Sequence, residues 1–172
     1  MLFRSPGQVK KVVADLTRAG ATKLILDVRR TSTGSPDEGL AVARLFVAKG
    51  TLAQRETRGV PPEAIAATAA DGPVTLPTEV LIDTGTTGAA EVLASALAGN
   101  QRAELIGERT IGRAAVQRLV RLPDGSGLWL STTKYLTPAG EPLHEKGLEP
   151  TVAVDQPEPL EFGAPPARSE EH

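Results

Sequence analysis

The sequence predicts an α/β fold, in which a mixed sheet with helices is followed by a β-rich C-terminal part. Two observations support this prediction. Up to residue 107, short apolar runs alternate with amphipathic helical patterns, which is typical of parallel strands joined by helices. After residue 115, the helical pattern gives way to strand-like runs that are separated by a turn.

The first part of the chain predicts helices and strands in alternation. Apolar residues recur at helical spacing after an N-cap and a proline, and a compact apolar run then indicates a buried strand in a parallel sheet. The expected elements are a helix from Ser5–Pro6 to Gly20, a strand over residues 23–29, a helix from Leu40 to Lys49–Gly50, and a strand over residues 51–57.

The middle of the chain contains a long interruption and then a second strand and helix. Glycines and prolines punctuate residues 58–77, which predicts a loop with a helical turn or two over residues 63–70. The expected elements after it are a strand over residues 79–82, a helix from Gly88 to Leu97, and a strand over residues 103–107.

The C-terminal part predicts strands over residues 116–122, 127–133 and 135–137, with a hairpin turn at residues 123–127. From Gln156 to His172 the chain is rich in Pro, Glu and Ala, which is typical of a tail that packs little. We therefore expect a core domain over residues 1–155 and a tail over residues 156–172.

The composition of the chain argues against several classes of function and site. The net charge of −2 gives no argument for binding nucleic acid or an anionic membrane, and the absence of cysteine excludes disulfides and a thiol nucleophile. With only two histidines we expect no metal site, and we expect no cofactor. The start of the chain has no apolar signal segment, which fits either a cytoplasmic protein or a piece of a longer one.

The stretch Asp83–Glu91 is the most informative one. A strand, a glycine-bearing turn and a helix start together present backbone N–H groups to an oxyanion. In a nucleophile elbow, a Ser, Cys or Thr stands at the tip of such a turn. Here the tip reads Thr86-Thr87-Gly88, so the sequence raises the question of whether a nucleophile is present.

Four stretches resemble the carboxyl-terminal (tail-specific) processing peptidases, which are serine peptidases with a core related to the Clp protease/crotonase spiral. Residues 107–117 read Gly-Glu-Arg-Thr-Ile-Gly-Arg-Ala-Ala-Val-Gln, where the family has Gly-Glu-Arg-Thr-Phe-Gly-Lys-Gly-Ser-Val-Gln. The other stretches are Leu24–Arg29 with Asp37-Glu38, Gly85–Glu91, and the run from Leu122 through residues 135–140 to residues 144–150.

The resemblance implies a site residue by residue. The family's nucleophilic serine corresponds to Gly88 and its basic lysine to Arg113, while Gln117 matches the glutamine that helps to orient the base. The oxyanion loop corresponds to Thr33 and Gly34, together with Ala89 after the nucleophile position.

These departures predict an inactive relative. Gly88 has no side chain that could form an acyl-enzyme, and the guanidinium of Arg113 stays protonated and cannot act as a base. We therefore expect a pseudopeptidase that keeps peptide-tail binding or a scaffold role, with Arg113 holding a carboxylate. A surface or ion-paired role for Arg113 is the simpler interpretation.

Two other functions stay open. An active peptidase would need Thr86 or Thr87 as nucleophile, with Glu91, His144 or a water as base, although threonines at this place ordinarily cap a helix. A structural oligomerisation module is the second alternative. Asp27, Asp37 and Glu38 are expected to serve a strand end and a helix start rather than acid–base chemistry.

The resemblance also implies partners and a location. We expect polypeptide C-termini or unfolded segments as ligands, possible homo-oligomers, and neither nucleic acid nor metal. Family enzymes usually carry a PDZ domain upstream, and residues 1–20 resemble none. Family members act in bacterial envelopes and plastids, so export of the parent protein is expected.

Overall fold

The computed structural model describes residues 6–154. The predicted N-cap at Ser5 and the predicted tail over residues 156–172 lie outside the described residues, so the division into core and tail stays a prediction. The described residues contain no helix that is long and apolar enough to cross a membrane.

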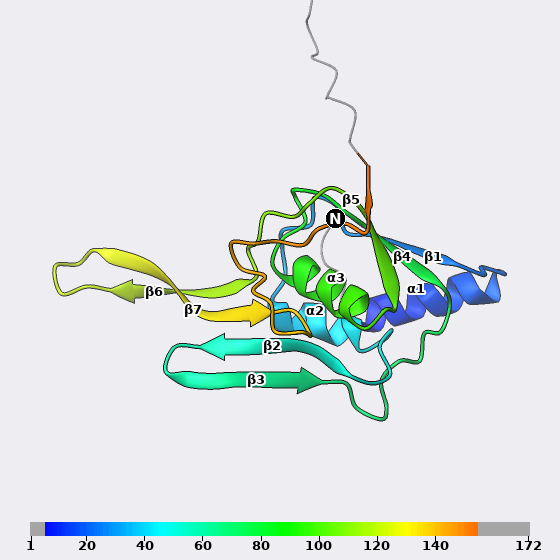
Figure 1. The fold of residues 1–172 in the computed structure, drawn as a ribbon, viewed down its shortest axis with the longest axis horizontal. Coiled ribbons are helices and arrows are strands. Elements are labelled where there is room, and N and C mark those ends of the chain that lie inside the picture. Colours follow the sequence, from blue (N-terminus) through cyan, green and yellow to red (C-terminus); the bar gives the residue numbers. More distant parts are fainter. Residues whose placement is uncertain (1–5, 155–172) are drawn as a thin grey trace, which may run out of the picture.

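Two four-stranded sheets and three helices make up the described fold (Figure 1). The first sheet is entirely parallel and has the order β1 (Leu24–Asp27), β4 (Thr78–Ile82), β5 (Ala103–Gly107), β8 (Val152–Ala153). The second is antiparallel, with the order β3 (Val60–Ala66), β2 (Thr51–Thr57), β7 (Gly127–Leu136), β6 (Ala115–Arg121). The helices are α1 (Pro6–Arg18), α2 (Pro36–Ala43) and α3 (Ala89–Gly99). This mixed α/β arrangement with a β-rich C-terminal part confirms the predicted fold class.

Helix α3 occupies the centre of the molecule (Figure 1). Every residue from Ala89 to Leu97 is buried, because α3 packs against α2, β5 and β2 together. A helix that is apolar on all sides is stable only inside a core. The first residue of α3 is therefore fixed in place by the packing of the whole helix.

The parallel sheet gathers three loops at one edge. Strands β1, β4 and β5 are neighbours and run in the same direction, so the segments that follow Asp27, Ile82 and Gly107 leave the sheet side by side. In open α/β sheets this carboxyl edge is the usual place for ligands. The predicted site residues lie in the segments that follow these three strands. The exception is Gln117, which lies in β6 of the second sheet.

The loop predicted over residues 58–77 is wrong in its first part, because residues 60–66 form strand β3. Pro61 and Pro62 suggested a loop, since proline cannot donate a hydrogen bond to a sheet ladder. Among residues 6–154, strand β3 pairs only with β2 and is an edge strand, where the missing N–H groups are tolerated. The helical turns predicted over residues 63–70 are therefore absent from residues 63–66.

Three smaller differences concern element ends. Helix α2 begins at Pro36 instead of Leu40 and ends at Ala43 instead of Lys49, since the amides of Leu45 and Phe46 bond three residues back and tighten the chain into turns. Strand β7 is continuous where two strands were predicted. Strand β8 was not predicted, because two exposed residues at a sheet edge leave no apolar pattern.

The contact between α2 and α3 yields a testable prediction. A Cβ atom at Gly39 would lie 2.2 Å from the carbonyl oxygen of Ala89, so Gly39→Ala forces the two helices apart. We expect the free energy of unfolding to fall by about 1–3 kcal/mol. Gly7→Ala is the matched control, because Gly7 lies in α1 with open space around it, and its thermal unfolding temperature should not fall. Equal unfolding temperatures for both variants would contradict the packing described here.

Candidate active site

The candidate site is organised by one buried carboxylate, that of Glu91. Its side chain is fully buried in the first turn of α3. Oxygen Oε2 accepts hydrogen bonds from the backbone amides of Gly88 at 2.9 Å and Arg113 at 2.7 Å. Oxygen Oε1 accepts from the Thr110 hydroxyl at 2.6 Å and the Gly112 amide at 2.7 Å. One carboxylate thus joins the turn after β4 to the loop after β5, which brings residues 88 and 113 together.

Gly88 has a backbone conformation that suits glycine, with φ 58° and ψ −113°. Most L-residues are strained there, at a cost of about 1–3 kcal/mol. A Cβ atom at this position would nevertheless have room, since the nearest heavy atom beyond its chain neighbours is the Arg113 carbonyl oxygen at 3.9 Å. The turn therefore has space for a side chain that would project beside residue 113.

A second carboxylate, that of Asp83, ties the same turn to the loop after β1. Asp83 Oδ1 accepts from the backbone amide of Arg30 at 2.9 Å. The Thr86 hydroxyl accepts from the Asp83 amide at 3.0 Å and lies within donating distance of the Val28 carbonyl and of Asp83 Oδ1. Thr86 is completely buried, so its hydroxyl is part of the turn's internal bonding.

The loop after β1 lies against the turn at the predicted oxyanion position. The Thr87 amide donates to the Thr31 carbonyl at 2.9 Å, and the exposed Thr33 and Gly34 follow directly. Within residues 6–154 the amide of Ala89, at the first position of α3, has no acceptor. First-turn amides of a helix bind oxyanions readily. This amide is one donor that the site offers.

The predicted site residues are thus only partly assembled. Gly88, Ala89 and Arg113 lie together around Glu91, and the Arg113 side chain is exposed. Gln117 lies on β6, paired with Ser131, and these described residues show no hydrogen bond between its side chain and Arg113. Thr33 and Gly34 lie on the adjoining loop.

His144 lies in a loop that supports residue 112. The Glu145 amide donates to the Gly112 carbonyl at 2.8 Å. The His144 side chain is largely buried, and its Nε2 lies 3.7 Å from the Glu145 carboxylate. Within the described residues its Nδ1 has no hydrogen-bond partner.

The acidic residues near β1 and α2 have structural partners. Arg29 donates to both carboxylate oxygens of Asp27, and this pairing lowers the pKa of Asp27. Glu38 and Ser35 form a capping box at the start of α2. Burial, together with the nearby Asp37 carboxylate, raises the pKa of Tyr135, whose hydroxyl donates to Asp37 at 3.4 Å.

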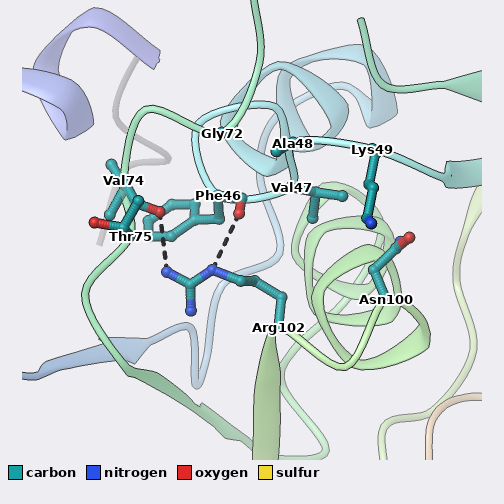
Figure 2. Close-up of a pocket in the computed structure, with 9 residues that line it drawn as sticks. All are labelled: Phe46, Val47, Ala48, Lys49, Gly72, Val74, Thr75, Asn100 and Arg102. Carbon is teal, nitrogen blue, oxygen red and sulfur yellow. Dashed lines mark hydrogen bonds between the residues drawn. The ribbon is translucent and has the colours of Figure 1, made fainter. Parts of the chain in front are cut away.

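A cavity of about 320 Å³ lies at the opposite end of α3 (Figure 2). Arg102 lines this cavity, and its guanidinium donates hydrogen bonds to the carbonyl groups of Phe46, Val74 and Leu76. Burial lowers the pKa of Arg102, and its guanidinium lies 5.8 Å from the centre of the Phe46 ring. Twelve helical positions separate Gly88 from Asn100, which is about 18 Å. This cavity is therefore separate from the candidate site.

Sequence reasoning missed the central role of Glu91. It weighed Glu91 only as a base for a threonine, whereas the structure makes it the common acceptor of two loops. A glutamate in the first turn of an otherwise apolar helix was the available signal, since a buried carboxylate needs several donors.

Comparison with known proteins places these features in context. A family model described as peptidase family S41 matches residues 2–154. The carboxyl-terminal-processing protease of Synechocystis is 35% identical over 150 residues, which cover 87% of this chain and 35% of that protein. Carboxy-terminal processing protease CtpA of Bacillus subtilis is 35% identical over 152 residues, covering 88% and 32%. The chain spans about a third of the length of these relatives.

Solved structures agree with the sequence comparison. The photosystem II D1 C-terminal processing protease superimposes with a TM-score of 0.78 at 33% identity, over 90% of this chain and 40% of that one. Mature CPAF has a TM-score of 0.70 at 15% identity, over 87% and 42%, which shows a shared fold.

Replacing Glu91 tests the organisation of the site. Glu91→Gln removes the charge that accepts four hydrogen bonds, and bonds to a charged group contribute about 1.5–3 kcal/mol each. We expect the free energy of unfolding to fall by at least about 2 kcal/mol, with faster hydrogen exchange at the amides of Gly112 and Arg113. The control is Glu104→Gln on the exposed face of β5. If both variants unfold alike in denaturant, Glu91 does not have this role.

Proposed function

Because this chain belongs to peptidase family S41, we propose that it is the core of a carboxyl-terminal processing peptidase that has lost hydrolysis and binds polypeptide C-termini. The observation that carries the proposal is the Glu91 network, which holds an elbow-like turn whose tip residue is Gly88. The site has the backbone of a hydrolase and lacks the reacting side chains.

The loss of hydrolysis rests on the chemistry of two positions. Peptide hydrolysis through an acyl-enzyme needs a nucleophile and a neutral base within hydrogen-bond reach. Gly88 offers no hydroxyl, and a guanidinium does not give up its proton at ordinary pH. With Gly88 and Arg113 in these two places, neither proton transfer nor acylation can start.

Binding of a C-terminus rests on what the site retains. A terminal carboxylate is planar and negatively charged, so it suits a guanidinium that can donate two parallel hydrogen bonds. The Ala89 amide and the positive end of the α3 dipole add to the attraction. Arg113 is exposed beside them, which leaves it accessible to a peptide.

The threonine alternative receives little support. The Thr86 hydroxyl is completely buried and bonded within its own turn, and the Glu91 carboxylate already accepts four hydrogen bonds, so it is a poor base. Thr87 is the other threonine considered as a nucleophile, and it is 7% exposed. Any cleavage that disappears in Thr87→Val would favour this alternative.

Peptide titration tests the binding proposal. We expect a peptide with a free C-terminal carboxylate to bind the wild-type chain, and an amidated copy to bind at least about tenfold more weakly, because a charge-assisted hydrogen bond is lost. Arg113→Ala should remove this preference. Lys49→Ala, at the far end of α3, is the matched control. Equal affinity of wild type and Arg113→Ala for the free-carboxylate peptide would exclude the proposed site.

Restoring the two side chains tests the loss of hydrolysis. We expect Gly88→Ser/Arg113→Lys to gain cleavage of an unstructured peptide, since the Cβ at residue 88 has room and faces residue 113. Gly88→Ala/Arg113→Lys has the same backbone strain without a nucleophile and should stay inactive. Mass spectrometry of the peptide gives the readout. Cleavage by the wild-type chain at the rate of the restored variant would refute the loss.

A further inference from the structure

The hairpin formed by β6 and β7 projects from the body of the molecule (Figure 1). Strand β7 pairs with β2 only from Thr133 onward, so residues 117–131 form a ribbon of two strands with no third neighbour among the described residues. Such a ribbon is only marginally stable in water unless something packs against it. We call residues 118–130 the ribbon tip.

The ribbon tip exposes apolar side chains on both faces. Leu119 pairs with Trp129 on one face, and Val120 pairs with Leu128 on the other, next to Leu130. These five side chains are between 40% and 64% exposed. A flat protein surface would cover one face only, whereas a medium that surrounds the ribbon would cover both.

The ribbon tip also carries positive charge on both faces. Arg118 lies on the face of Leu130, and Arg121 lies on the face of Trp129. In the part of the chain that the structure describes, no carboxylate lies within ion-pair distance of either guanidinium. The turn between the two strands contains one carboxylate, Asp124, so residues 118–130 have a net charge of +1 in a chain whose net charge is −2.

A second copy of the chain is a poor partner for this ribbon. Full antiparallel pairing of two β6 strands places Arg118 directly opposite its own counterpart. Like charges that face each other across strands are destabilising, and charged residues on edge strands oppose such pairing. The charges instead complement an anionic surface.

We propose that the ribbon tip docks on an anionic lipid bilayer and enters its headgroup region. Tryptophan is stable at the boundary between headgroups and acyl chains, where leucine and valine side chains leave water. Arginines near the surface are attracted to anionic lipids by about 1 kcal/mol each. This proposal is independent of peptide binding at Arg113.

The fluorescence of Trp129 tests the proposal directly, since it is the only tryptophan in the chain. The full chain is titrated with vesicles of phosphatidylcholine alone, or of phosphatidylcholine with about one third phosphatidylglycerol. We expect Trp129 emission to move to shorter wavelength, with cosedimentation, on the anionic vesicles, and the effect to weaken in high salt. Equal binding to both compositions would overturn the proposal.

Two pairs of substitutions separate charge from apolar burial. Arg118→Gln/Arg121→Gln should weaken partitioning by about 25-fold, from about 1 kcal/mol per cation. Lys23→Gln/Lys49→Gln removes the same charge elsewhere and should leave binding unchanged. Leu128→Ser/Leu130→Ser should abolish the shift while Trp129 remains as reporter, and an unchanged thermal unfolding temperature confirms that these exposed positions leave the fold intact. Unaltered binding by either ribbon variant would refute docking.

Other occupants give distinct results. A shift of Trp129 emission on concentrating the protein without vesicles, with a doubled mass in light scattering, would assign the ribbon tip to a second copy. A shift with soluble polyglutamate but not with vesicles would assign it to an acidic protein. Either result overturns the lipid proposal.

Discussion

The arrangement of this site depends on the burial of one negative charge. A carboxylate inside a core is costly unless donors surround it, and Glu91 accepts from four donors, which are three backbone amides from two separate stretches and one hydroxyl. Those donors belong mainly to the backbone, so the network does not depend on which side chains residues 88 and 113 carry. This independence supports our proposal that the turn persists without a nucleophile at residue 88.

The two ends of α3 illustrate different uses of polar groups. At its start, Glu91 and Asp83 fix loops at the carboxyl edge of the parallel sheet, where backbone amides and an exposed Arg113 face outward. Beyond its C-terminal end, the guanidinium of Arg102 donates hydrogen bonds to three carbonyl groups and so holds the neighbouring turns in place. We propose the ligand site at the first end, because the Ala89 amide at the start of α3 lies beside the accessible guanidinium of Arg113.

Much of the fold was predictable from local patterns. The strands over residues 24–27 and 78–82 follow from compact apolar runs, and α3 follows from its Ala/Leu-rich composition. Strand β3 was missed because its stability comes from pairing with β2, which overrides the effect of Pro61 and Pro62. Family resemblance assigned candidate positions to the site, and these stay a prediction. The Glu91 network joins residues 19–22 positions apart and has no periodic signature in the sequence.

Our central claim is that the backbone around Glu91 keeps the geometry described here whatever side chains stand at residues 88 and 113. A crystal structure of Gly88→Ser/Arg113→Lys measures this directly. We expect residues 83–91 and 108–114 to keep the described hydrogen bonds to Glu91, with the new hydroxyl beside the new amine. Displacement of either loop, or loss of the Glu91 bonds to residues 112 and 113, would contradict it.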